Sequence, residues 1–186
     1  LYKVPILESI GSTNQAISKL AFDSRQVNKE SLFIAIKGST VDGHLYIKTA
    51  IENGARSIIC EELPEEIQEG ITYIKVKDSH SSLGIIASNF YNNPSGQLKL
   101  VGITGTNGKT TTSTLLYSLF QSLGIKSGLL STVCIKVGRE EFPATHTTPD
   151  PIQLNFYLQK MVEQGCKVCF MEASSHGIEQ KRIAGL

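Results

Sequence analysis

Short apolar runs alternate along this sequence with longer stretches in which apolar residues recur every three or four positions. Three runs rich in β-branched or aromatic residues predict strands at 31–36, 57–60 and 71–76. Helical spacing predicts helices over 44–53 and 78–91, with Asp78 suited to cap the second helix. The segment 92–96 contains Pro and Gly but no apolar residue, so we expect a first unit to span residues 1–94.

The second half of the chain repeats this alternation. A strand over 98–104 runs into a glycine-bearing loop, and a helix follows from Lys109 towards Gly124. The apolar residues expected on one face of that helix are Leu115, Leu116, Leu119, Phe120 and Leu123. Further elements are a strand at 128–131, a hairpin at 134–142, a helix from Pro151 capped by Asp150, and a strand over 166–172. Alternating strands and helices are typical of parallel sheets, so we expect an α/β fold in both units, 1–94 and 98–186.

Composition narrows the class of protein. Hydrophobic residues make up 40% of the 186 residues and charged residues 19%, which provides a core and excludes a disordered chain. The formal net charge of +1 argues against a nucleic-acid-binding surface. No apolar run approaches the roughly 20 residues that span a bilayer, and no secretory leader is recognisable at the start of the sequence. We therefore expect a cytoplasmic monomer without a nucleic-acid or membrane partner.

The ends of the sequence are also informative. The chain starts at Leu1 without a methionine and stops at Leu186, soon after a loop that carries candidate site residues. The strands of the second unit would have little to cover them at that point. We expect the sequence to be a fragment of a longer enzyme.

The four cysteines are too few and too scattered for a disulfide-stabilised secreted domain. The spacing of Cys166 and Cys169 could provide half of a zinc site or a redox pair. A zinc site needs a second ligand pair, and the sequence has no other C-x-x-C or H-x₃-H motif. A redox pair is expected at a helix start, whereas these residues belong to an apolar strand, so a structural role is favoured.

The segment 104–111, Thr-Gly-Thr-Asn-Gly-Lys-Thr-Thr, lies between a predicted strand and a predicted helix. Its glycines let backbone N–H groups approach phosphate oxygens, and a helix N-terminus adds positive potential. Lys109 would then reach the β- and γ-phosphates of a nucleotide, and the Thr110 hydroxyl would bind Mg²⁺. The usual pattern has a glycine where Ile103 stands, so this loop is a variant of the GTPase form. The alternative, a strand–turn–helix junction with chance glycines, does not account for the Gly-Lys-Thr-Thr ending.

Polar residues follow the predicted strand that ends at Glu172. A carboxylate at the carboxyl end of a parallel strand, beside a phosphate loop, suits Mg²⁺. The alternative is a strand-end glutamate that faces solvent. Ser174, Ser175 and His176 lack the Gly-x-Ser-x-Gly context of a nucleophile, so we interpret them as groups that orient a substrate. His176 could equally be a structural histidine.

Two further segments offer contacts for an anion. The loop 146–150 leads into a helix start, so the hydroxyls of Thr147 and Thr148 could hold an anionic group of a substrate. Alternatively, these threonines merely precede the helix cap. Arg182 suits a carboxylate or a diphosphate, although a Lys-Arg pair is more often a solvated surface.

Together these segments resemble the Mur ligases of peptidoglycan synthesis. The resemblance rests on Gly-Thr-Asn-Gly-Lys-Thr-Thr at 105–111, His-Thr-Thr-Pro-Asp-Pro at 146–151 and Glu-Ala-Ser-Ser-His-Gly-Ile-Glu-Gln-Lys-Arg at 172–182. In the first unit, residues 23–25, 32–35 and 38–44 look like the uridine-binding domain of that family. The phosphate loop alone would also fit folylpolyglutamate synthetases. The segment that runs from Glu172 to Arg182 resembles the members that add the third residue of the stem peptide.

The resemblance implies an N-terminal uridine-binding α/β domain over 1–94 and part of a P-loop domain over 98–186, without the C-terminal domain. It implies that ATP is bound by Gly105, Thr106, Asn107, Gly108, Lys109, Thr110 and Thr111. Lys109 would be catalytic, and Thr110 and Glu172 would hold Mg²⁺. The implied contacts to the UDP moiety are Phe22, Ser24, Ser39, Thr40 and Val41, and those to the muramoyl-dipeptide are His146, Thr147, Thr148, Ser174, Gln180 and Arg182.

The implied reaction is an ATP-dependent amide ligation. The D-glutamate carboxylate of UDP-N-acetylmuramoyl-L-alanyl-D-glutamate is phosphorylated to an acyl phosphate, which the amine of diaminopimelate or lysine then attacks. In this family a carbamylated metal-binding lysine and the C-terminal domain lie beyond Leu186, so we expect this chain alone to be inactive. Two other functions stay open: a sibling ligase that adds a different stem residue, and a non-catalytic nucleotide-binding module. The sequence contains no Asn-Lys-x-Asp motif for guanine, which argues against a GTP-dependent switch.

Overall fold

The computed structural model describes residues 1–38 and 41–186. The chain forms two compact units, Leu1–Leu83 and Gly84–Leu186, and the boundary between them falls inside helix α2 (Ser79–Phe90). This boundary precedes the Pro- and Gly-containing segment at which the sequence predicted a domain change. None of the helices in the described ranges is long and apolar enough to cross a membrane.

The first unit contains one mixed sheet. Its strands are β1 (Ile6–Ile10), β2 (Lys19–Ala21), β3 (Ser31–Ile34), β4 (Ser57–Cys60) and β5 (Thr72–Val76). Its short helices are η1 (Ser24–Gln26), η2 (Gly43–Tyr46) and α1 (Ile47–Glu52). The strand order is β1-β5-β4-β3-β2, in which β2 to β5 are parallel and β1 is antiparallel to β5. The sequence had predicted β3, β4 and β5, but not β1 or β2.

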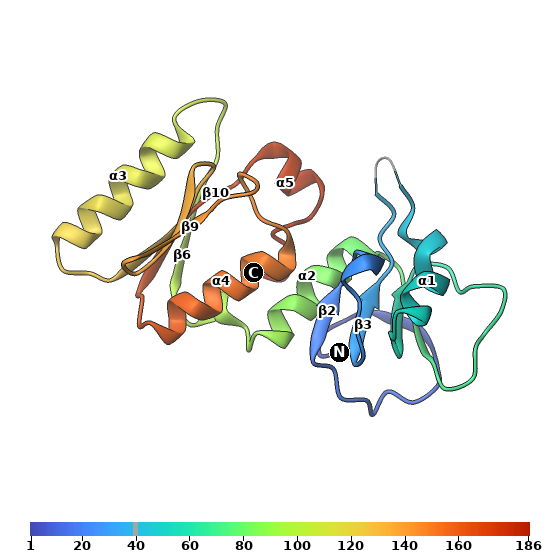
Figure 1. Ribbon diagram of the computed structural model, residues 1–186. Coiled ribbons are helices and arrows are strands. Elements are labelled where there is room, and N and C mark those ends of the chain that lie inside the picture. Colours follow the sequence, from blue (N-terminus) through green and yellow to red (C-terminus); the bar gives the residue numbers. More distant parts are fainter. Residues whose placement is uncertain (39–40) are drawn as a thin grey trace. The chain divides into compact units, whose positions relative to one another are not determined.

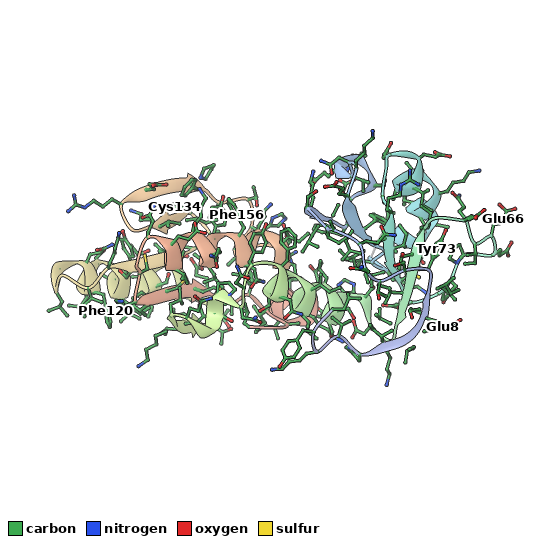
Figure 2. The ribbon with its side chains drawn as sticks, turned by 90° about the horizontal axis from the view of Figure 1, so that it is seen from below. Glu8, Glu66, Tyr73, Phe120, Cys134 and Phe156 are labelled. Carbon is green, nitrogen blue, oxygen red and sulfur yellow. The ribbon has the colours of Figure 1, made fainter. Side chains whose placement is uncertain are left out.

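The core of this unit lies between α1 and one face of the sheet. Ile47 and Ala50 of α1 pack with Phe33, Ile58 and Tyr73 of three neighbouring parallel strands. Figure 2 shows the labelled Tyr73 within the unit and Glu66 on the loop that precedes β5. Side chains of the opposite face, such as Leu32, Ile34 and Ile59, are also buried. Strands that are buried on both faces consist of nearly continuous apolar residues, and this pattern allowed β3, β4 and β5 to be predicted from the sequence.

The second unit contains a sheet with a parallel half and an antiparallel half. Its strands are β6 (Lys99–Ile103), β7 (Ser127–Leu130), β8 (Cys134–Val137), β9 (Glu140–Pro143) and β10 (Val168–Glu172). Its helices are η3 (Pro94–Gly96), α3 (Lys109–Ser122), α4 (Pro151–Glu163) and α5 (Ser175–Glu179). The order is β6-β10-β7-β8-β9; β6, β10 and β7 are parallel, and the predicted hairpin β8–β9 extends the sheet in antiparallel fashion.

Helices α3 and α4 cover opposite faces of this sheet (Figure 1). Leu116 and Phe120 of α3 pack against Leu129 and Phe170, and the rings of Phe120 and Phe170 meet edge to face at 5.0 Å. On the other face, the buried residues from α4 are Leu154, Leu158 and Met161. The α/β class expected from the sequence is confirmed, with antiparallel strands added at one edge of each sheet.

The apolar face predicted for α3 is only partly buried. Leu116 and Phe120 contact the sheet, whereas Leu115 and Leu123 are each 64% exposed and Leu119 is 50% exposed. The five residues cover a wider arc than one helix–sheet contact uses, since positions three and four apart diverge around the helix. The sheet thus covers only part of the predicted apolar face, at Leu116 and Phe120.

The cysteines have the structural character that the sequence favoured. All four are free thiols, and Cys60, Cys166 and Cys169 are buried. Burial raises the pKa of Cys60 to about 11 and also raises the pKa of Cys166 and Cys169. Within the part of the chain that the structure describes, no group of three or more His, Cys, Asp or Glu side chains could hold a metal ion. These thiols are therefore core residues rather than ligands or nucleophiles.

Helix α4 begins as its sequence predicts. Asp150 is the N-cap, and its Oδ1 accepts hydrogen bonds from the backbone N–H groups of Ile152 at 2.9 Å and Gln153 at 3.0 Å. Pro151 occupies the first helical position, where a missing N–H costs nothing. Burial raises the pKa of Asp150 above its ordinary value, although these backbone bonds and the charge of Arg182 act in the opposite direction.

We predict that Asp150→Ala lowers the free energy of unfolding by about 1 kcal/mol, because two N–H groups lose their acceptor. Asp150→Asn keeps that acceptor and is the matched control. The pKa of Asp150 is higher in the folded chain than the ordinary carboxyl value of about 4 that applies to the unfolded chain. The folded state therefore holds this proton more tightly, and the wild type loses stability as the pH rises above about 4. Asp150→Asn should therefore gain stability relative to wild type over that range, as measured by denaturant unfolding. Equal stability of the Ala and Asn variants would contradict the capping role.

Candidate functional site

The loop between β6 and α3 has the backbone form of a phosphate cradle. Gly105 and Gly108 have positive φ angles of 146° and 81°, which side chains with a Cβ rarely adopt. Gly108 is the N-cap of α3, and the first helical residue is Lys109. The Lys109 Nζ folds back over the loop and donates to the carbonyl oxygens of Gly105 at 2.6 Å and Thr106 at 3.4 Å. The loop itself is exposed, so its N–H groups and its lysine are accessible to an anion.

Glu172 lies beside this loop at the carboxyl edge of the sheet. In the parallel pairing of β10 with β6, Glu172 is in register with Ile103, the last residue of β6, and the N–H of Ala173 donates to the Ile103 carbonyl at 2.9 Å. The side chain of Glu172 is fully buried. The alternative that this glutamate simply faces solvent is therefore wrong.

Both carboxylate oxygens of Glu172 are held by one residue, Thr132. The Thr132 N–H donates to Oε1 at 3.0 Å, and its hydroxyl donates to Oε2 at 3.1 Å. Among the described residues, no lysine, arginine or histidine forms an ion pair with Glu172. The buried carboxylate is thus satisfied by neutral donors and keeps lone pairs free for a cation.

The sequence analysis missed Thr132. It lies just beyond β7, and β7 pairs directly with β10, so its loop meets the end of β10 at the same sheet edge. A signal was present, because a polar residue that follows a buried parallel strand belongs to the ligand-binding edge of an α/β sheet. The strand order, which the sequence does not reveal, was needed to choose Glu172 as its partner.

The hydroxyl of Thr147 completes a short chain of hydrogen bonds. Its Oγ1 lies 3.1 Å from the Thr132 Oγ1. The Thr132 hydroxyl is the donor in this contact as well as towards the Glu172 Oε2, so its single proton can serve only one of the two acceptors at a time. The Thr147 hydroxyl accepts here and keeps its own proton, which it can donate to an anionic group of a ligand, as the sequence suggested.

Thr148 connects this edge to the following loop. Its buried Oγ1 donates to the Glu172 carbonyl at 3.0 Å and accepts from the Ser174 N–H at 3.0 Å. The Ser174 hydroxyl lies 3.3 Å away and caps the short helix α5 by accepting from the Gly177 N–H at 3.0 Å. Thr148 thus has a structural role, because it joins the end of β10 to the N-cap of α5.

Arg182 is held in place rather than freely solvated. Its Nη1 donates to the Thr148 carbonyl at 2.7 Å, while Nε and Nη2 donate to the Gln180 Oε1 at 3.0 and 2.7 Å. Gln180, Arg182, Thr148 and Ser174 therefore form one connected group. His146 and His176 are exposed, and the Nδ1 of His146 contacts only the neighbouring Thr145 hydroxyl, at 3.1 Å, among the bonds found in the described ranges.

The candidate UDP contacts belong to the first unit. Phe22 and Ser24 follow β2, where Phe22 is 40% exposed and Ser24 is buried with its carbonyl accepting from the Asn53 side chain at 2.9 Å. Val41 is exposed in the loop that follows β3. Ser39 and Thr40 lie outside the residues that the structure describes. Phe22, Ser24 and Val41 lie in segments that follow the carboxyl ends of the parallel strands β2 and β3.

Two protein-family models match the chain. The model described as "Mur ligase family, catalytic domain" matches residues 16–91, and the model described as "Mur ligase middle domain" matches residues 103–186. The chain belongs to the Mur ligase family. The second match begins at the phosphate loop and includes every candidate residue from Gly105 to Arg182.

Individual relatives agree with this assignment. A curated UDP-N-acetylmuramoyl-L-alanyl-D-glutamate–2,6-diaminopimelate ligase from Cytophaga hutchinsonii is 55% identical over 187 aligned residues, which cover 100% of this chain and 38% of the relative. A solved structure of a ligase of the same name has a TM-score of 0.75 and 25% identity over 95% of this chain and 37% of its own. A MurF ligase from Thermotoga maritima, in complex with ADP, has a TM-score of 0.54 and 25% identity over 84% of this chain and 32% of its own. The Mur ligase chain described here thus spans less than two fifths of the length of these relatives.

The donor set fits Mg²⁺ with a nucleotide. Mg²⁺ is usually held by one or two carboxylates together with substrate phosphates and water rather than by a cage of protein ligands. The Glu172 carboxylate and the Thr110 hydroxyl at the start of α3 are oxygen donors of that kind, on neighbouring elements of one sheet edge.

We predict that Thr148→Val destabilises the second unit by about 1–3 kcal/mol, because the Ser174 N–H and the Glu172 carbonyl lose a buried partner. Thr148→Ser keeps the hydroxyl and should recover most of the loss, apart from the missing methyl group. Denaturant unfolding measures both, and hydrogen exchange of the 173–178 amides should rise only in the Val variant. A Val variant as stable as the Ser variant would show that these bonds do not hold the loop.

Proposed function

We propose that the protein containing this chain is an ATP-dependent amide ligase of peptidoglycan synthesis, which adds diaminopimelate to UDP-N-acetylmuramoyl-L-alanyl-D-glutamate. The observation that carries this proposal is the 55% identity along the whole chain to the Cytophaga hutchinsonii ligase of that name. The phosphate loop and the buried Glu172 at one sheet edge supply the chemistry that such a ligase needs. The Thermotoga maritima relative with ADP supports a nucleotide at this edge.

The second unit would bind ATP and promote phosphoryl transfer. The backbone N–H groups of 105–111 and the Lys109 ammonium would hold the β- and γ-phosphates, with Lys109 leaving its present carbonyl partners. Bound Mg²⁺, held by Thr110 and Glu172, would neutralise phosphate charge. The D-glutamate carboxylate attacks the γ-phosphorus and ADP leaves, which forms an acyl phosphate. The amine of diaminopimelate then displaces phosphate and forms the amide.

The remaining residues of this edge would orient the acceptor substrate. Arg182, fixed by Gln180 and Thr148, offers its guanidinium to an anionic group of the muramoyl-dipeptide. Thr147, whose oxygen accepts from the Thr132 hydroxyl, would donate its own hydroxyl proton to an anionic group of the substrate. Ser174 and His146 lie on the flanking loops. Catalysis on this view is mostly positioning and charge neutralisation.

The first unit would bind the UDP moiety. Phe22 and Val41 are exposed apolar side chains at the carboxyl ends of parallel strands, and Ser24 lies in the turn that follows β2. This edge is where α/β sheets bind ligands. Ser39 and Thr40 are included in this proposal from the sequence alone. We further propose the domains as 1–94 and 98–186, and a monomer in the cytoplasm.

We predict that Lys109→Ala in the full-length ligase reduces kcat/KM for amide formation by at least about 100-fold, because a charge that stabilises the transferring phosphoryl group is lost. The measurement is steady-state phosphate release that depends on diaminopimelate. Lys167→Ala is the matched control, since Lys167 is an exposed lysine at the amino end of β10, away from the loop.

The control variant should retain wild-type activity, and both variants should keep the wild-type melting temperature. Lys109→Ala activity within about threefold of wild type would refute the role given to this lysine. A loss of equal size in both variants would point to an effect on folding rather than on phosphoryl transfer.

A further inference from the structure

The ring of His44 joins two loops at the carboxyl edge of the sheet in the first unit. Its Nδ1 lies 2.7 Å from the Asp42 Oδ1, and its Nε2 lies 2.9 Å from the backbone nitrogen of Glu61. Asp42 and His44 follow β3, whereas Glu61 follows β4. The side chain of His44 is 15% exposed, and that of Asp42 is 34% exposed.

These two contacts define the tautomer of the ring. A backbone N–H can only donate, so the Nε2 that faces Glu61 must present its lone pair. The proton of the neutral ring then lies on Nδ1 and is donated to Asp42. The arrangement superficially resembles an Asp–His catalytic pair, but Nε2 is occupied by a main-chain donor and cannot take a proton from a substrate.

Asp42 closes the loop that carries Val41. Its Oδ1 also accepts the His44 N–H at 2.9 Å, and its backbone pairs with Lys37 across the loop. The Gly38 N–H donates to the Val41 carbonyl at 3.0 Å, which tightens the base of the same loop. The pKa of Asp42 is held below its ordinary value, chiefly by the backbone hydrogen bond from His44, so its carboxylate is charged and a strong acceptor.

The Gly43 position next to the ring has no room for a side chain. A Cβ there would lie 2.7 Å from the Ile36 nitrogen and 2.7 Å from the Ile36 oxygen. The Gly43 N–H in turn donates to the Ile36 carbonyl at 2.8 Å. The chain therefore passes back directly against Ile36, two residues beyond the end of β3, before it reaches His44.

Glu61 extends the connection to a third loop. Its Oε1 accepts from both the N–H and the hydroxyl of Ser79 at 2.8 Å. The segments that follow β3, β4 and β5 are thus linked in sequence by Asp42, His44, Glu61 and Ser79. These segments form the edge to which parallel α/β sheets bind ligands.

We propose that His44, as the Nδ1-protonated tautomer, is a positioning residue for the UDP site of the first unit: it fixes the described segment from Val41 to His44 without touching the nucleotide. This inference rests on the proposed function of that unit. A segment that is already held at the sheet edge loses less conformational entropy when a ligand binds, so the ring contributes to affinity through preorganisation.

The first test is the titration of the chain with UDP by calorimetry. His44→Ala should weaken UDP binding by about tenfold, the loss expected when roughly 1.4 kcal/mol of preorganisation is removed. Asp42→Ala removes the other end of the same hydrogen bond and should have a similar effect. Asp42→Asn keeps an acceptor oxygen for His44 and is the matched control, expected to bind within about threefold of wild type.

Two further readouts separate positioning from general stability. The imidazole nitrogen shifts of the wild-type chain, measured by NMR, should show a protonated Nδ1 and an unprotonated Nε2 on His44. In the full-length ligase, His44→Ala should raise KM for the UDP-linked substrate while KM for ATP and kcat stay near wild type. A fall in kcat or a rise in KM for ATP would instead indicate a general structural defect and overturn the proposal.

The remaining outcomes are equally decisive. The proposal would be overturned if folded His44→Ala and Asp42→Ala bound UDP within twofold of the wild-type affinity. It would also be overturned if NMR showed that the proton of the His44 ring is on Nε2. If His44→Ala does not fold, the UDP affinities of Asp42→Ala and Asp42→Asn test the proposal: it requires that Asp42→Ala bind more weakly than wild type and that Asp42→Asn bind within about threefold of it. Failure of the wild-type chain to bind UDP would refute the proposed function of the first unit and this inference with it. Binding by wild type but equal binding by all variants would refute the positioning role alone.

Discussion

The buried carboxylate of Glu172 is the constraint around which the second unit is arranged at its ligand edge. A charge cannot be buried unless hydrogen bonds or a cation satisfy it. Thr132 provides a main-chain N–H and a hydroxyl, which fixes the loop after β7 against the end of β10. The same Thr132 hydroxyl also donates towards the Thr147 Oγ1 at 3.1 Å, which connects the loop that contains Thr147 to this edge. One buried carboxyl group thus joins the loops that follow β7 and β9 to the end of β10.

The same physical solution occurs in both units. Loops that follow parallel strands have few backbone partners of their own, so side chains tie them together. In the second unit Thr148 links the end of β10 to the N-cap of α5. In the first unit the His44 ring links the loop after β3 to the end of β4. A binding edge made of separate loops becomes rigid in this way, while its accessible groups stay free for a ligand.

The exposed leucines of α3 show that apolar spacing along a helix does not by itself predict which residues are buried. Leu116 and Phe120 reach the sheet, while Leu115, Leu119 and Leu123 do not. Apolar spacing says which positions on a helix avoid water in general, but a single sheet face covers only part of that arc.

The sequence by itself determined the α/β class, the cap of α4, the glycine-containing loop before α3 and the glutamate at the end of β10. These features depend on residues within a few positions of one another, where turn chemistry and periodicity act. Only the tertiary structure showed that Glu172 is buried against Thr132, 40 residues away. It also showed that the His44 ring accepts a hydrogen bond from the backbone N–H of Glu61, 17 residues away. Such contacts depend on strand order and register, and a linear pattern carries no information about which loops meet at the edge of a sheet.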